Sequence, residues 1–160
     1  MTTFLSEHLA EIIGIPLTLS LNALLVACEF SLIKIRFSHF NTELRERVES
    51  HKRLGPLIES GDRTIRVIRM CLTACLILYA LLMYPLLMAL FELGGVVSEL
   101  SRAISAILAF TLALSLHQLV GELFPRGLGL AYPFQSLRLG APFIRVFGWL
   151  TRPLRLLVLS

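Results

Sequence analysis

Three long apolar stretches dominate the pattern of hydrophobic and polar positions along the chain. Ile12–Ile33 contains one charged residue, Glu29, whereas Met70–Phe91 and Ala103–Val120 contain no Asp, Glu, Lys or Arg. A helix of 22 residues rises about 33 Å, enough to cross a hydrocarbon layer of about 30 Å. We therefore predict an all-α membrane protein with three transmembrane helices, at about residues 12–35, 68–91 and 103–125.

The segment between the first two apolar stretches, residues 37–69, is polar and predicts a helical hairpin at the membrane surface. Glu43 precedes Arg47 and Glu49 precedes Arg53, each by four residues, which is a spacing that supports a helix. Gly55-Pro56 is expected to end this first short helix, and Ser60-Gly61-Asp62 to form a second turn before the membrane.

The C-terminal segment, about residues 134–159, is apolar but carries arginines at regular spacing. Arg138, Arg145 and Arg152 recur every seven residues. In a fourth transmembrane helix Arg145 would lie at mid-bilayer, at a cost of about 2.5–3.5 kcal/mol, and Pro142 and Pro153 would interrupt the helix. We therefore predict a broken amphipathic juxtamembrane segment that lies in the interface.

Basic residues indicate the orientation, because cytoplasmic loops are enriched in Lys and Arg. Of the fifteen, only Arg102 lies between the second and third spans and none precedes the first. The other fourteen share one side: Lys34, Arg36, Arg45, Arg47, Lys52, Arg53, Arg63, Arg66, Arg69, Arg126, Arg138, Arg145, Arg152 and Arg155. We predict a multi-pass protein of the cell inner (plasma) membrane, with its N-terminus outside and the hairpin in the cytoplasm.

Composition agrees with a lipid environment. Apolar residues make up 56% of the 160 residues, charged residues 16%, and mean hydropathy is +0.76. The net charge of +4 suggests contact with anionic lipid rather than with nucleic acid, because basic and aromatic residues are not interleaved. Cys28, Cys71 and Cys75 all lie in apolar stretches, so we expect packing residues rather than disulfides or a zinc site.

Catalytic motifs and a cleavable leader are not expected. The sequence has no His-Glu-x-x-His, no Gly-x-Ser-x-Gly and no P-loop, so we do not expect an enzyme. No Lys or Arg occurs among residues 1–11, so the basic region of a signal peptide is missing and the first span is expected to be retained.

Glu122 is the strongest candidate for a functional residue, because acids inside spans are costly. It lies in Gly121-Glu122-Leu123-Phe124-Pro125, where Gly121 permits close approach and Pro125 frees a carbonyl one turn back. A carboxylate beside freed carbonyls suits a hard cation such as Mg²⁺. The alternative is an interfacial acid paired with Arg126, and we favour the cation site.

Other polar residues inside the spans have simpler interpretations. Glu29 lies near the end of the first span and could pair with Lys34 or Arg36. Asn22, seven residues earlier on the same face, is either a polar contact between helices or part of a site. His117 is interpreted as a hydrogen-bonding residue between helices rather than a metal ligand.

Two motifs resemble a known family. Residues 21–36, LNALLVACEFSLIKIR, are similar to the first-span motif of the CorC/cyclin-M (CNNM) transmembrane domain, usually NAFFVAAEFALVKxR. Residues 117–126, HQLVGELFPR, resemble its HxxxGExxPK. The resemblance covers roughly residues 16–153. We therefore predict that the chain, residues 1–160, forms a single CNNM-type transmembrane domain. The paired CBS domains and the C-terminal domain that usually follow have no counterpart here.

The resemblance implies a three-span homodimer that exports Mg²⁺ or Co²⁺, with Glu122 at the cation site. Asn22 and Ser20 would face the same cavity, and Thr73 is the oxygen-bearing residue left in a second-span segment where the family has several. We expect a weakly bound or transported Mg²⁺ and, as a further partner, a separate cytoplasmic regulatory protein. The alternative is a non-transporting membrane module that dimerises or binds a partner.

Overall fold

The computed structural model describes residues 8–37, 46, 54–95 and 99–150, and all of its regular elements there are helical. In chain order they are α2 (Leu9–Phe37), α4 (Gly55–Glu59), α5 (Gly61–Leu93), α6 (Glu99–Leu116), the π-helix η1 (His117–Leu123), α7 (Phe124–Ala131) and α8 (Pro133–Leu150).

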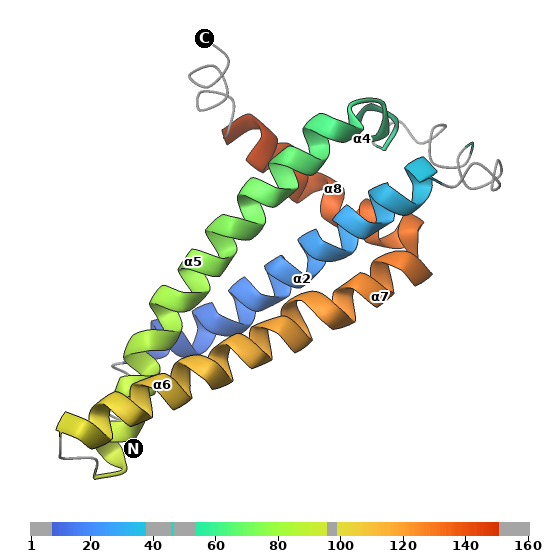
Figure 1. Ribbon diagram of the computed structural model, residues 1–160. Helices are drawn as coiled ribbons and strands as arrows, with labels where there is room; N and C mark the ends of the chain where they lie inside the picture. The colour runs from blue at the N-terminus through green and yellow to red at the C-terminus, as the bar shows by residue number, and fades with distance from the viewer. Residues whose placement is uncertain (1–7, 38–45, 47–53, 96–98, 151–160) are drawn as a thin grey trace.

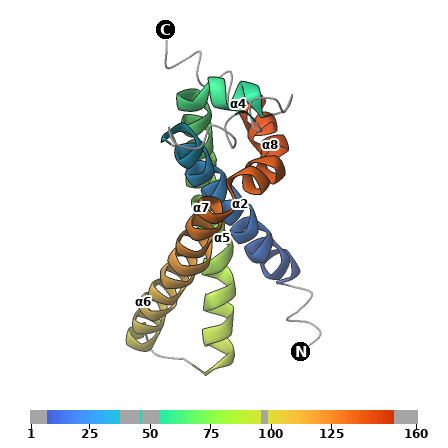
Figure 2. The same cartoon turned by 90° about the vertical axis from the view of Figure 1, so that its right-hand side faces the viewer.

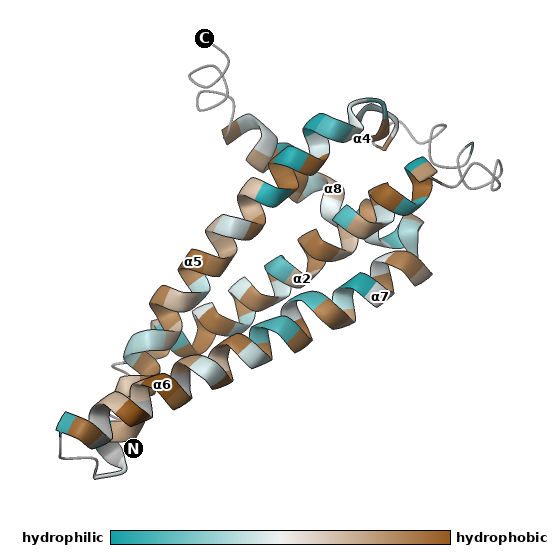
Figure 3. Ribbon diagram, in the orientation of Figure 1, coloured by the Kyte–Doolittle hydropathy of each residue, from teal (hydrophilic) through white to brown (hydrophobic). Residues whose placement is uncertain are grey.

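Three long rods make up the fold, and α2 is the central one (Figure 1). The first rod is α2, the second is α5, and the third runs without interruption through α6, η1 and α7. Within the described residues, each rod is long and apolar enough to cross a membrane, over Leu9–Phe37, Gly61–Glu92 and Ala106–Ala131. Apolar residues predominate along the rods (Figure 3). The prediction of three transmembrane helices is confirmed.

The connections contain two prolines, Pro56 and Pro125. Gly55-Pro56 begins α4, where proline is well tolerated in the first turn, and α4 is a short helix between the predicted break and the Ser60 turn. Pro125 lies inside the continuous third rod, which runs on to Ala131. The predicted turn at Ser60 is present and joins α4 to α5. The predicted surface helix around Glu43–Arg53 lies, apart from Glu46, outside the described residues.

α8 is amphipathic, as predicted, but the predicted break at Pro142 is wrong. The helix runs from Pro133 to Leu150, and Pro142 is exposed on it. Its buried face consists of Ser136, Leu137, Gly140, Ala141 and Ile144. This face packs against α2 and α5 and belongs to the same core. Packing on one face therefore compensates for the amide that Pro142 cannot donate. Pro153 lies outside the described residues.

The core lies in the half of the rods nearer α4 and α8. It combines the end of α2 with the beginning of α5 and one face of α8, and its largest fully buried apolar residues are Leu25, Leu54, Ile68 and Leu137. Cys71 and Cys75 are buried there, which confirms their interpretation as packing residues. Toward the other end the rods diverge (Figure 2), and large residues such as Ile107 and Phe110 are exposed.

Two glycines allow α7 and α8 to approach α2 closely. A Cβ atom on Gly129 would lie 2.9 Å from the carbonyl carbon of Ala27 and nearer still to its oxygen. A Cβ on Gly140 would overlap the Cys28 Sγ atom. Because the Ala27 obstacle is backbone, which cannot rotate away, α7 can keep this distance from α2 only while residue 129 lacks a side chain.

We predict that Gly129→Ala destabilises the protein by about 1–3 kcal/mol, because the added methyl group pushes two backbones apart. Gly127→Ala is the matched control on the same helix, since no atom lies within 4 Å of its Cβ position. The melting temperature in detergent should fall for Gly129→Ala only. Equal changes in both variants would contradict close packing at this crossing.

Candidate functional site

The site begins with a backbone carbonyl that proline leaves without its usual partner. Pro125 has no N–H to donate to the Gly121 carbonyl one turn earlier. The Asn22 side chain of α2 supplies the missing donor, with its Nδ2 2.9 Å from the Gly121 oxygen. Asn22 is buried, with 2% of its surface exposed. The interpretation of Asn22 as a polar contact between helices is confirmed.

The same arrangement occurs again two turns further along α2. Pro133 cannot donate to the Gly129 carbonyl, and the Ser31 hydroxyl, whose one hydrogen is shared with the Ala27 carbonyl at 2.6 Å, lies 3.0 Å from it. Lys34 then donates to the Leu130 carbonyl at 2.5 Å, near the end of α7. The third rod thus depends on side chains of α2 for several of its backbone hydrogen bonds.

Glu122 lies in the π-helical segment between these two contacts. The segment is closed by a bond from the Phe124 N–H to the Leu119 carbonyl, five residues back. Such segments add a residue to the turn and are frequent at functional sites. The Glu122 side chain is partly exposed, next to the Asn22–Gly121 contact.

The alternative partner expected for Glu122 is engaged elsewhere. The Arg126 guanidinium lies over the Phe30 ring, 4.6 Å from its centroid. In the described part of the chain no ion pair joins Glu122 to Arg126. The described neighbour that interacts electrostatically with the Glu122 carboxylate is His117, rather than Arg126.

His117 begins the π-helix and is buried, with 5% of its surface exposed. Its ring lies against Tyr79 of α5, with centroids 5.2 Å apart, and Tyr79 donates to the Ala113 carbonyl at 3.1 Å. The Nδ1 atom has no hydrogen-bond partner among the described residues. The expected hydrogen bond between helices is therefore not found at this atom, and His117 packs against α5 through its ring.

Ser20 and Thr73 are not brought to Glu122 by the fold of the single chain. Both side chains are exposed. Ser20 lies two residues from Asn22, so it points to the opposite side of α2. Thr73 donates to the Arg69 carbonyl of its own helix at 3.1 Å. Of the four residues predicted to hold a cation, Asn22 is the one that contacts the backbone next to Glu122, through the Gly121 carbonyl.

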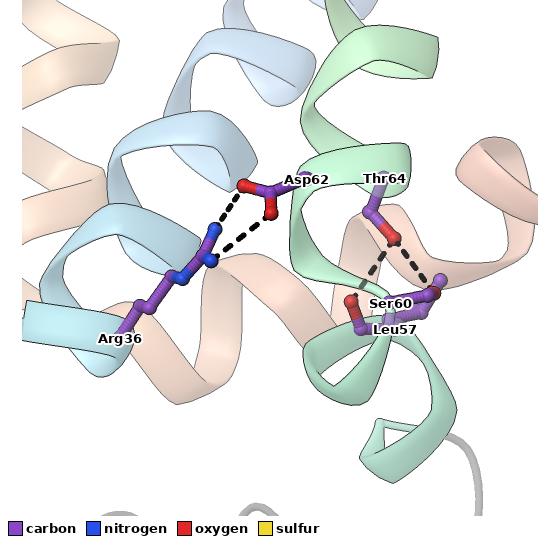
Figure 4. Close-up of polar contacts among 5 residues, drawn as sticks. All are labelled: Arg36, Leu57, Ser60, Asp62 and Thr64. Atoms are coloured by element: carbon purple, nitrogen blue, oxygen red, sulfur yellow. Dashed lines mark hydrogen bonds and ion pairs between the residues drawn. The ribbon is translucent and has the colours of Figure 1, made fainter.

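Glu29 is paired differently from the sequence-based expectation. Its Oε1 accepts a hydrogen bond from Arg69 Nε of α5 at 2.8 Å, so pairing with Lys34 or Arg36 is wrong. Arg36 instead forms a two-pronged ion pair with Asp62 at the beginning of α5 (Figure 4). Both pairs join α2 to α5, across 40 and 26 residues of sequence, and local spacing gives no signal for such contacts.

The chemistry available at the site is that of oxygen ligands. No group of three or more His, Cys, Asp or Glu residues among the described residues could hold a metal ion. What the site offers is one carboxylate, one amide oxygen and backbone carbonyls of an irregular helical segment. Hard cations bind such oxygens and commonly keep several waters.

These features define a helical membrane protein with three spans and a polar site beside an irregular turn of the third. A family model, the cyclin M transmembrane N-terminal domain, matches residues 13–159. The chain belongs to this family, as its two motifs indicated. Neither the curated proteins nor the solved structures gave a match.

We predict that Asn22→Leu destabilises the protein by about 1–3 kcal/mol, because the Gly121 carbonyl then stays buried without a donor. Ser20→Ala, an exposed change two residues away, should stay within about 0.5 kcal/mol. Pro125→Ala restores an N–H in the same turn, so the cost of Asn22→Leu should be smaller in that background. Unfolding measurements on the four-variant cycle would refute this if the two changes were additive.

Proposed function

We propose that the protein transports a divalent cation, Mg²⁺ by preference, through a site around Glu122. The observation that carries the proposal is the placement of Glu122 in a π-helical segment within an apolar span, beside the Asn22–Gly121 contact. Membership of the cyclin M transmembrane family supports it, because this family is linked to divalent-cation transport.

The negative charge of Glu122 makes the site attractive to cations. A carboxylate in a span is costly unless it is paired or serves an ion pathway. With Arg126 against Phe30, a bound cation is the partner that would offset this cost. Glu122 is partly exposed, so the chain's own side chains do not seal it off from an ion that retains some waters, as Mg²⁺ does.

The binding is expected to be weak, which suits a cargo rather than a resident cofactor. Six oxygens are usual for Mg²⁺, and Glu122 and Asn22 supply few of them. Ser20 and Thr73 would contribute only from a different arrangement of the exposed faces, such as a homodimer. We propose that the chain works as a homodimer for this reason and because the family resemblance implies it.

We predict that Mg²⁺ raises the melting temperature of the purified full chain and that Glu122→Gln abolishes the rise. At ten times its dissociation constant Mg²⁺ would stabilise the wild type by about 1.4 kcal/mol. Glu99→Gln, an exposed acid at the start of α6, is the matched control and should keep the response. Mg²⁺ flux into vesicles should likewise be present for the wild type and Glu99→Gln and be lost for Glu122→Gln.

An equal rise in wild type and Glu122→Gln would remove Glu122 from the site. No rise and no flux in any of them would favour the second candidate, a non-transporting membrane module that binds a partner. The observation that favours this second candidate is the scarcity of oxygen ligands around Glu122, with Thr73 bonded to its own helix.

We also propose that the end of the rods nearer α4 faces the cytoplasm and that the N-terminus lies outside. The support is the distribution of basic residues, fourteen of fifteen of which fall on the α4 side in the sequence. In the fold, α4, α8 and the end of α2 gather at one end of the rods (Figure 1).

We predict that a cysteine at position 99 reacts with an impermeant maleimide in intact cells and that one at position 59 does not. Both native residues, Glu99 and Glu59, are exposed, so accessibility depends only on the side of the membrane. The native cysteines are buried and should give a low background. Labelling at position 59 with protection at position 99 would show that the opposite orientation holds.

A further inference from the structure

A polar cavity of about 470 Å³ lies where the first two rods meet at the α4 end. Its walls come from the last turn of α2, from α4 and from the first turns of α5. This volume falls in the range of pockets that bind small molecules, about 300–1,000 Å³. The cavity is separate from Glu122, which belongs to the third rod and does not line it.

Three arginines and two acids line the cavity: Arg36, Arg63, Arg66, Glu59 and Asp62. Asp62 is occupied by the two-pronged pair with Arg36 (Figure 4). Arg36 also lies close to Gly61, with its Nη1 atom 3.6 Å from the position of a Cβ atom there. The acid that remains is Glu59.

Arg63 and Arg66 are therefore available for a ligand. Within the described part of the chain neither forms an ion pair, although Arg66 also attracts Asp62 electrostatically, and both are exposed. They lie three residues apart on α5, so they share one side of the helix. Two guanidinium groups on one wall of a cavity match the oxygens of a phosphate, which arginine binds through two parallel hydrogen bonds.

The level of the cavity along the transmembrane helices indicates which kind of phosphate-bearing molecule it binds. The apolar spans end at Phe37 and begin at Gly61, so the cavity lies at the polar boundary of two transmembrane helices. Phospholipid headgroups occupy this level of a bilayer, and basic pockets between transmembrane helices are known to bind anionic ones. Ile35 and Ile58 line the cavity beside the arginines and provide an apolar surface for the glycerol and upper chain.

We propose that this cavity binds the phosphate group of an anionic phospholipid headgroup, held by Arg63 and Arg66. The lipid ties the beginning of α5 to the end of α2, where the Arg36–Asp62 pair already joins them. The exposed arginines thereby become part of a site rather than of a diffuse basic surface.

The test compares lipids on the purified full chain in detergent. Phosphatidylglycerol should raise the melting temperature more than phosphatidylcholine, and native mass spectrometry should retain one phosphatidylglycerol per chain. In Arg63→Gln/Arg66→Gln its affinity should fall about tenfold or more, since each lost charge-assisted hydrogen bond is worth at least that factor. The phosphatidylglycerol affinity of Arg66→Lys should lie between those of the wild type and the double variant, because lysine keeps the charge and loses the two-pronged geometry.

Arg138→Gln is the control, because Arg138 is exposed on α8 and does not line the cavity. It should keep the preference for phosphatidylglycerol. The proposed site would be overturned if Arg138→Gln lost as much affinity for phosphatidylglycerol as the single variant Arg66→Gln. It would also be overturned if the double variant kept the wild-type preference. Inorganic phosphate should give no comparable rise, and a rise equal to that from phosphatidylglycerol would overturn a lipid as the source of the phosphate.

Discussion

Every backbone polar group inside lipid needs a partner within the protein, and this constraint explains the arrangement of the three rods. Pro125 and Pro133 each leave a carbonyl one turn back without its donor. Asn22 of α2 donates to the Gly121 carbonyl, and the Ser31 hydroxyl, which is shared with the Ala27 carbonyl of α2, lies within hydrogen-bond distance of the Gly129 carbonyl. The central position of α2 follows, because the third rod is complete only beside it. The glycines that bear these carbonyls also permit the approach that the bonds require.

The proposed cation site uses the same irregularity for another purpose. A regular helix would satisfy its own carbonyls and present Glu122 to lipid on a uniform surface. The π-helical segment instead places Glu122 directly after Gly121, whose carbonyl is already bonded to α2. The local irregularity is thus stabilised by α2, and the chain need not strain its backbone there, since no described residue other than Gly95 has a positive φ.

Most of the fold could be predicted from the sequence, since uncharged stretches of about 20 residues have few alternatives to a membrane helix. The freed carbonyl at Pro125 could also be foreseen, because proline acts on its own helix. What could not be foreseen was its partner, Asn22, or the pairing of Glu29 with Arg69. These contacts join residues far apart in sequence, and no local spacing encodes them. Continuity of α8 through Pro142 was missed because packing on α2 outweighed a local propensity.

The uneven distribution of the core has a consequence for how the molecule opens. Buried apolar residues and the ties from α2 gather in the half of the rods nearer α8, whereas α5 and α6 diverge at the other end (Figure 2). Local unfolding costs least where few apolar contacts are lost. Amide hydrogens of α5 beyond Tyr79 should therefore exchange through separate, low-energy openings, while those of α2 between Leu25 and Ile35 exchange only when the whole bundle comes apart.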